Sequence, residues 1–421
     1  MTTGLRNWAG NVTFAASAVH RPSSTDELCD LVARSPRVRA LGSAHSFSRV
    51  ADTDAVLVRL DELAGEVSVS SGTATIPAGM RYAEVASGLH AQGWALANMA
   101  SLPHIRVAGS VSTGTHGSGD TLQTLSAAVT GIELVGPDGS VRWVSRDNDP
   151  AQFPGTVVSL GALGIMTRLN LAVEPAYEIT QTVHGQVPLD QVASELDAIF
   201  ASAYSVSVFT DWSSGVARVW QKHRLGDPRP AWSGGELALV DLHPIIKFDP
   251  ACATPQLGRP GAWHERMPHF RAEFTPSAGH EIQTEFLLDR SDGRAALAAL
   301  RPMAERIGEV LHVTELRSMK ADDLWLSPAY GRDTIGVHFT WFDDMDRVAP
   351  VLREVEQRLA DLRPRPHWGK VSTMSPSYVV GQYPEMGRFI ELAHRYDPDG
   401  KFVNEFVYYL MSAHDAAVTG P

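Results

Sequence analysis

Two turns of small residues are the places where this chain could bind a phosphate group beside a flat ring. In the first, the largely apolar run 38–41 leads into the small residues of 42–44, and His45 follows. Small side chains let backbone N–H groups approach a phosphate, and the imidazole could approach a ring. The second turn, 107–119, interleaves glycine with serine and threonine, which suits a nest of donors around a pyrophosphate. Either turn alone is typical of an ordinary loop.

Glu315 and Arg317 suggest a different kind of site. The alternation along 313–318 places both residues on one side of a predicted strand. By itself this pattern favours a surface ion pair of little energetic value. Lys370 ends the segment 367–370, and a lone lysine is normally solvated. In a pocket, its charge could stabilise a developing alkoxide.

Three further polar residues are weaker candidates. Ser101 precedes a Leu-Pro pair, so it lies in an extended segment or a turn. His338 and Thr340 are two apart on a predicted strand and therefore share one face. Taken alone, each is an ordinary polar residue. The other histidines show no metal-ligand spacing, and we expect no metal site.

The elements that must position these residues follow two patterns. Up to about residue 170, short strands and helices mix in an α+β manner. A capping box at 24–27 predicts a helix start, and 137–139 predicts a hairpin turn. Beyond residue 177 the strand-like segments are longer, and helices are predicted near 294–307 and 347–362.

Two other stretches are less regular. The segment 226–261 is dense in proline and glycine, which predicts an irregular surface. The tail 386–406 predicts a helix, a turn and then a short segment. No G-x-G-x-x-G follows a first strand, so a nucleotide-binding Rossmann unit is not indicated.

Length and composition limit the function classes. A chain of 421 residues suggests two domains. Its net charge of −12 argues against nucleic acid and anionic membranes as partners, because both reward basic patches. Its two cysteines, Cys29 and Cys252, show no zinc spacing and no support for a disulfide. With no predicted signal peptide or membrane span, the expected location is cytoplasmic.

Together, the two small-residue turns resemble the phosphate-binding stretches of the vanillyl-alcohol-oxidase-type flavoproteins. Several other segments resemble the alditol oxidases within that group, and the likeness runs from Asn7 to about Phe406. These segments are 98–104, 263–266, 325–333, 338–341 and 365–370. The resemblance implies a two-part FAD-binding domain over 1–175, an α+β cap domain over 176–370, and a segment, 371–421, that returns to the FAD domain. The expected fold class is therefore α+β.

The resemblance also implies roles for individual residues. His45 would carry FAD through a covalent bond to the 8α position of its ring, which raises the redox potential. Lys370, Arg317 and Glu315 would be catalytic, and the last two would hold adjacent hydroxyls of a substrate. The implied substrate-binding residues are Ser101, Glu315, Arg317, His338, Thr340 and Lys370. The implied cofactor-binding residues are Leu41, Gly42, Ser43, Ala44, His45, Ser46, Ser101, Gly109, Ser112, Thr113, Gly114, Thr115, His116, Gly164, Ile165 and Lys370.

The implied reaction oxidises the terminal CH₂OH of linear polyols such as xylitol and sorbitol to the aldose, and reduces O₂ to H₂O₂. The expected partners are a polyol and O₂, and the expected state is a monomer. The main alternative is an oxidase or dehydrogenase of sugar-1,4-lactones, because those relatives share the E-x-R and HWGK-like segments. The small side chain of Ala100, beside Ser101, could either admit or obstruct oxygen. A non-enzymatic binding protein would be expected to lose the segments that are intact here.

Overall fold

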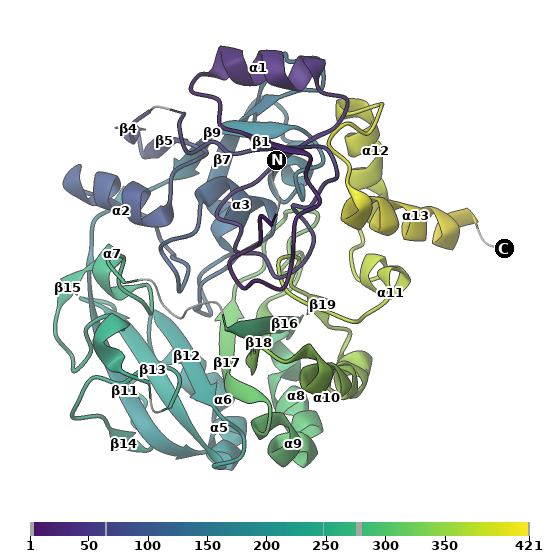
Figure 1. Cartoon of the computed structure of the whole chain (residues 1–421). Coiled ribbons are helices and arrows are strands. Elements are labelled where there is room, and N and C mark those ends of the chain that lie inside the picture. Colours follow the sequence, from purple (N-terminus) through teal and green to yellow (C-terminus); the bar gives the residue numbers. More distant parts are fainter. Residues whose placement is uncertain (1–3, 64, 247, 275–279, 420–421) are drawn as a thin grey trace.

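The computed structural model describes residues 4–63, 65–246, 248–274 and 280–419. Figure 1 shows two parts, one above the other. The upper part holds the N-terminal strands and helices together with two C-terminal helices, α12 (Met386–Tyr396) and α13 (Glu405–Thr419). The lower part holds a large antiparallel sheet, and the chain passes between the two parts more than once.

Small sheets and short helices build the upper part. A parallel sheet has the order β1-β3-β2, an antiparallel sheet has the order β4-β5-β9-β7-β8, and β6 pairs with β10. These strands are β1 Ala18–His20, β2 Val38–Ala40, β3 Val56–Val58, β4 Ser68–Ser70, β5 Thr73–Pro77, β6 Trp94–Ala95, β7 Val129–Val135, β8 Val141–Ser145, β9 Ile165–Ala172 and β10 Glu174–Pro175. The helices are α1 Thr25–Arg34, α2 Tyr82–Ala91, α3 Val107–Ser112, η1 Leu125–Ala128 and α4 Phe153–Val157.

Local sequence signals account for several of these elements. The Ser24 side chain accepts the backbone N–H of Glu27 at the start of α1, as the capping motif predicts. The Glu27 carboxylate, however, reaches back to the N–H of Ser23 and not to that of Ser24. The predicted hairpin between β7 and β8 is confirmed, and Gly139 takes the positive φ of 82° that its turn requires.

The large sheet has the order β14-β11-β13-β12-β17-β18-β16-β19, with β15 beside β11. Its central pairs are antiparallel, and Glu315 on β17 lies opposite His338 on β18. The same register places Glu285 on β16 opposite His338. The strands are β11 Glu178–Pro188, β12 Ser205–Thr210, β13 Val216–Arg224, β14 Glu236–Leu237, β15 Gly261–Ala262, β16 Glu281–Asp289, β17 Leu311–Met319, β18 Thr334–Phe342 and β19 Arg365–Pro366.

Helices cover one face of this sheet, and the other face looks toward the upper part (Figure 1). Leu316 packs among the helices, whereas its neighbours Glu315 and Arg317 point to the opposite face, as the alternation predicts. The remaining helices are α5 Leu189–Ser194, α6 Leu196–Ala201, η2 Pro250–Cys252, α7 Trp263–Arg266, η3 Arg290–Asp292, α8 Gly293–Leu300, η4 Arg301–Met303, α9 Ala304–Gly308, α10 Met345–Leu359, η5 Ala360–Leu362 and α11 Pro376–Val380.

Four expected elements differ from the structure. The helix predicted near 294–307 is broken into α8 and α9, because Pro302 cannot continue the hydrogen-bond ladder. The helix predicted near 347–362 begins at Met345 and ends at Leu359. The second small-residue turn begins as a helix, α3, and the short segment predicted up to residue 406 leads into a long helix, α13, that was not predicted from the sequence. The stretch 226–261 is largely irregular, as expected.

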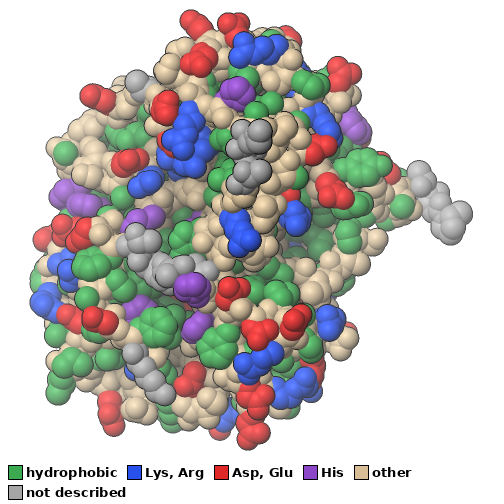
Figure 2. Space-filling view, in the orientation of Figure 1, with side chains coloured by type: hydrophobic (Ala, Val, Ile, Leu, Met, Phe, Trp, Pro, Cys, Tyr) green, Lys and Arg blue, Asp and Glu red, His purple; other side chains and the backbone are tan. Residues whose placement is uncertain are grey.

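Charge and cysteine placement are ordinary. Acidic and basic side chains are interspersed over the face in Figure 2, without one continuous basic stripe on that face. Cys29 and Cys252 are both free thiols. Within the described ranges, no helix has the length and apolar character needed to cross a membrane.

Candidate active site

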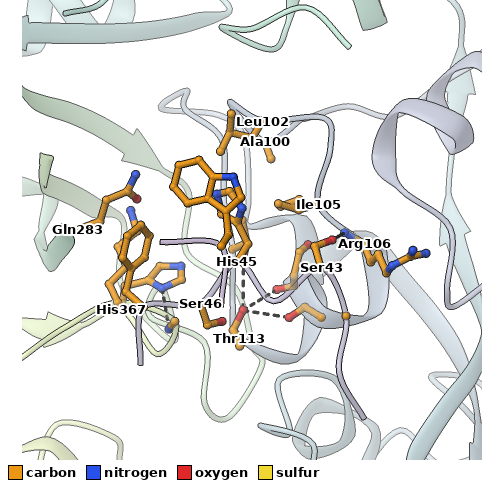
Figure 3. A pocket seen from close by; sticks show the side chains of 18 of the residues that line it. Ser43, His45, Ser46, Ala100, Leu102, Ile105, Arg106, Thr113, Gln283 and His367 are labelled. Atoms are coloured by element: carbon orange, nitrogen blue, oxygen red, sulfur yellow. Dashed lines mark hydrogen bonds between the residues drawn. The ribbon is translucent and has the colours of Figure 1, made fainter. Parts of the chain in front are cut away.

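A cavity of ≈ 310 Å³ lies between the two parts of the molecule and brings most predicted site residues together. In Figure 3, His45 lies near the middle, with Ser43 on one side, Gln283 and His367 on the other, and Thr113 below it. The predicted residues that line the cavity are Leu41, Gly42, Ser43, Ala44, His45, Ser46, Ser101, Gly109, Ser112, Thr113, Thr115, His116, Gly164, Glu315, Arg317, His338, Thr340 and Lys370.

Two predicted cofactor-binding residues do not line the cavity. A Cβ on Gly114 would lie 2.7 Å from Pro328 Cδ, so this glycine is packed against a neighbouring loop. Ile165 is 1% exposed and its side chain belongs to the hydrophobic core. The structure therefore places both residues against packed neighbours, and their contact with a cofactor stays a prediction.

His45 ends a turn that is fixed at both sides. The Trp8 N–H donates to the carbonyl of Ala44, whose φ is 54°, and the Trp8 ring lies 4.4 Å from the imidazole. The Ser43 hydroxyl accepts the N–H of Arg106 at the start of α3. Burial lowers the pKa of His45 to about 4, and Lys370 contributes to this shift. The imidazole is therefore neutral, and its Nε2 is buried without a hydrogen-bond partner.

The second small-residue segment presents backbone, not hydroxyl protons, to the cavity. The Thr113 hydroxyl donates to the carbonyl of Gly109, and the Ser112 hydroxyl donates to that of Ala108. Both hydroxyl hydrogens are therefore used in hydrogen bonds to backbone carbonyls of α3. A Cβ on Gly109 would meet no heavy atom within 4 Å, so the backbone there borders open space.

Glu315 is buried and held in place by a chain of contacts. The His269 Nε2–H donates to Glu315 Oε1 at 3.0 Å, and Ser207 lies beside the same nitrogen. The backbone that carries His269 is anchored by Lys222, a fully buried lysine that donates to the carbonyls of 266–268 at 2.6–2.9 Å. Burial alone would raise the pKa of Glu315, but Arg317 and His269 hold it well below its usual range.

Arg317 and Lys370 share one carboxylate. Arg317 donates to Glu285 Oε1 at 2.6 Å, and Lys370 Nζ donates to Glu285 Oε2 at 2.8 Å. Arg317 Nε lies farther from Glu315, at 3.6 Å. The expected pairing of Glu315 with Arg317 is present, but Glu285 is the nearer partner. The pair is buried and does not form the surface bridge that the pattern alone favoured.

The charges of this cluster are set by burial and by one another. Burial would raise the pKa of Glu285, but Arg317 and Lys370 lower it well below its usual range. Burial lowers the pKa of Lys370, and Glu285 opposes that shift. For Arg317, burial is outweighed by the two carboxylates, and its pKa is raised. The cavity thus contains fixed opposite charges away from water.

His338 stands between these charges as a neutral base. Burial lowers its pKa well below the usual value, and Lys370 adds to that shift. Its Nε2 lies 3.2 Å from Gln283 Oε1, an acceptor, so Nε2 carries the proton. Its Nδ1 is then a free acceptor, 3.8 Å from Glu315 Oε2 and without a hydrogen bond.

Several residues of the site were missed from the sequence. Glu281, Gln283 and Glu285 all line the cavity from β16. Their spacing of two residues is the same strand signal that identified Glu315 and Arg317, and it could have found them. His269 carried no comparable signal, because it lies in a loop whose position depends on Lys222 in another strand.

The comparisons with known proteins agree with this geometry. Residues 16–145 match the FAD binding domain family, and residues 279–410 match the D-arabinono-1,4-lactone oxidase family. The chain is 46% identical to the alditol oxidase of Streptomyces sp. (strain IKD472), over 98% of this chain and 100% of that protein. The chain belongs to the alditol oxidase family. This membership confirms the resemblance drawn from the sequence.

More distant proteins share the architecture of this alditol oxidase family member. The L-gulono-1,4-lactone dehydrogenase of Mycobacterium tuberculosis is 29% identical over 95% of this chain and 97% of its own. The crystal structure of cholesterol oxidase from B. sterolicum superposes with a TM-score of 0.79 at 13% identity, and covers 98% of this chain and 97% of that one. This likeness concerns the fold alone, and it confirms the expected α+β fold class. The expected domain bounds stay a prediction.

FAD is the cofactor of this family member, and the cavity fits it. The orphaned Nε2 of His45 and the open space at Gly109 lie where a ring and a phosphate would need access. Among the described residues, His116, Glu285 and His367 also come close enough to share a metal ion. Both oxygens of Glu285 are already bonded to cations, which would repel a metal. We therefore assign no metal there.

Proposed function

We propose that this chain oxidises the terminal CH₂OH of linear polyols, such as xylitol and sorbitol, to the aldehyde, with O₂ reduced to H₂O₂. One observation carries the proposal: Glu315, Arg317, His338 and Lys370 converge on the cavity that contains His45. A carboxylate beside two cations can bind neighbouring hydroxyls of a chain in one defined orientation. Such a site rejects analogues that leave buried polar groups unpaired.

The protein's own groups would supply binding and proton transfer. Arg317 and Lys370 would stabilise the developing alkoxide, because fixed charges act strongly in a site without water. The free Nδ1 of His338 would accept the hydroxyl proton, since this imidazole is neutral and buried beside Glu315. Bound FAD would accept the hydride and deliver two electrons to O₂. Ser101 and Thr340, which also line the cavity, would orient the remaining hydroxyls.

The test is oxygen-dependent peroxide release from the purified holoenzyme, with xylitol and L-gulono-1,4-lactone compared side by side. The proposal expects peroxide from xylitol and little from the lactone. The reverse result would favour the second candidate, a sugar-1,4-lactone oxidase, which is supported by the match of 279–410 to the lactone oxidase family. Turnover of xylitol with an artificial acceptor but not with O₂ would contradict only the oxidase part.

We further propose that FAD is attached covalently to His45. The imidazole is neutral, buried and lacks a partner at Nε2, as a nucleophile requires. After acid precipitation, the flavin should remain in the protein pellet of the wild type and appear in the supernatant of the His45→Ala variant. His104→Ala is the control, because His104 is the neighbouring histidine and its Nε2 bonds to the carbonyl of Ala272. Wild-type flavin in the supernatant would overturn the attachment.

A further inference from the structure

Glu285 is the one buried carboxylate described here that bonds both cavity cations, and the proposed chemistry gives it no direct task. Its side chain is 0% exposed, and it meets Arg317 and Lys370 at the wall of the cavity. His116 Nε2 lies 3.2 Å from the same carboxylate. A buried charge is expensive unless it is paired, so the charge of Glu285 and those of Arg317 and Lys370 depend on one another.

Lys370 needs a partner to stay charged. It is surrounded by groups from several elements: Glu285 on β16, Glu315 and Arg317 on β17, His338 on β18, His367 of its own turn and His45 of the cofactor turn. Burial and Arg317 both favour its neutral form, and the histidines are uncharged. Glu285 is the nearest carboxylate to Lys370, at 2.8 Å, and it accepts one hydrogen bond from Lys370 and one from Arg317.

We propose that Glu285 is a positioning residue that keeps Lys370 protonated and holds both Lys370 and Arg317 at fixed places in the cavity. The inference rests on the proposed polyol oxidation, in which Lys370 acts through its positive charge. Without the carboxylate, Lys370 would lose its proton at a lower pH, and Arg317 would be free to turn toward Glu315. The enzyme would then lose activity at alkaline pH before the wild type does.

The experiment compares pH profiles of xylitol turnover for wild type, Glu285→Gln, Glu285→Asp and Glu356→Gln. In Glu285→Gln the alkaline limb of kcat should move down by about one pH unit or more, since an opposite charge at this distance shifts a pKa by that order. Glu285→Asp keeps the charge at a longer reach and should move the limb less, in the same direction. Glu356→Gln is the matched control, because it removes a buried carboxylate that bonds Ser372 and Thr373 and no cation.

A second readout does not depend on the polyol. The midpoint potential of the bound flavin should fall once Lys370 loses its proton. This fall should occur at a lower pH in Glu285→Gln than in the wild type. An equal loss of kcat at every pH, with an unshifted potential, would overturn the proposal and leave Glu285 a structural residue. If Glu285→Gln does not fold, the Glu285→Asp variant decides the question: an alkaline limb of kcat at the wild-type pH would overturn the proposal. A wild type without xylitol activity contradicts the proposed function instead.

Discussion

At the residue scale, this site is a set of charges buried against one another. Glu285 and Glu315 each face a cation, and each is further fixed by a histidine. Pairing of this kind keeps groups ionised that burial would otherwise neutralise. The arrangement offers a substrate donors and acceptors whose geometry is set before binding, which limits the reorganisation that reaction requires.

Loss of either cavity cation should abolish most of the activity. In Arg317→Ala and Lys370→Ala, kcat should fall on the order of 10²–10³-fold, the usual cost of one donor to a developing oxyanion. Flavin absorbance should stay with the protein, since the cofactor turn is intact. Lys320→Ala is the control, because this lysine is half-exposed and paired with Asp333. Turnover near the wild-type value in both cavity variants would contradict the assigned roles.

The residues that the sequence predicted lie both on regular strands and in turns such as the one that ends at His45. Glu315, Arg317, His338 and Thr340 follow a period of two and share a face, as β17 and β18 confirm. Glu285 obeys the same rule and was still missed, because a polar alternation does not state which of its members will be buried. The orientation of His269 depends on Lys222 across the sheet, and such contacts are absent from local pattern.

At the element scale, the residues that cap a helix determine where it begins and ends. α10 begins after Asp344, whose side chain accepts the N–H of Arg347 at 3.2 Å. The predicted helix near 347–362 is confirmed, and its start lies two residues earlier because the apolar period alone does not locate a cap. The sequence also missed α3, since its small residues are equally typical of a loop, and its helical form depends on packing against the core.

Removal of the α10 cap should destabilise the lower part of the molecule. Asp344→Ala leaves the first turn without its acceptor, at a cost of about 1 kcal/mol in the free energy of unfolding. The thermal midpoint should fall by about 1 °C, because the entropy of unfolding is about 2.1 cal/mol/K per residue and this chain is long. Differential scanning calorimetry would measure this. Asp346→Ala is the control: it removes an exposed acid in the first turn that makes no cap bond, and it should lower the midpoint less. Equal effects of the two substitutions would show that the negative charge, and not the cap hydrogen bond, stabilises the helix.

At the scale of the whole molecule, the two parts are tied by segments far apart in the chain. The Phe47 N–H donates to the carbonyl of Gly369, and the Ser48 hydroxyl donates to that of Trp368. Arg39, fully buried, donates to the carbonyls of Leu160 and Phe402 and so joins β2 to the C-terminal segment. These long-range contacts could not be predicted from the sequence, because no local pattern indicates which distant residues will meet.

Acidification should destabilise the molecule as a whole. Burial lowers the pKa of His243 to about 4, and burial lowers those of His338 and His367 well below their usual value. An unfolded histidine takes up a proton near pH 6.5 while the folded one does not, so the free energy of unfolding falls as pH drops from about 6.5 toward 4.

The carboxylates extend this trend to lower pH. Glu285 and Glu315 stay ionised in the folded state where unfolded ones protonate, so further stability is lost below about pH 4.5. Asp322 and Asp397, whose pKa values burial raises, oppose it. The thermal midpoint, followed by near-UV circular dichroism from about pH 8 to pH 5, should decrease steadily. A constant or rising midpoint would contradict this balance.

The bonds from Phe47 and Ser48 to the turn that carries Lys370 also impose an order on biosynthesis. Ser48 and Trp368 are separated by 320 residues, so the turn around His45 gains its final support only after the ribosome has released most of the chain. Attachment of a cofactor at His45 would then be a late event, and colour would mark molecules that have completed both parts. A prematurely terminated chain would stay colourless and could be cleared by proteases before it ever bound a polyol.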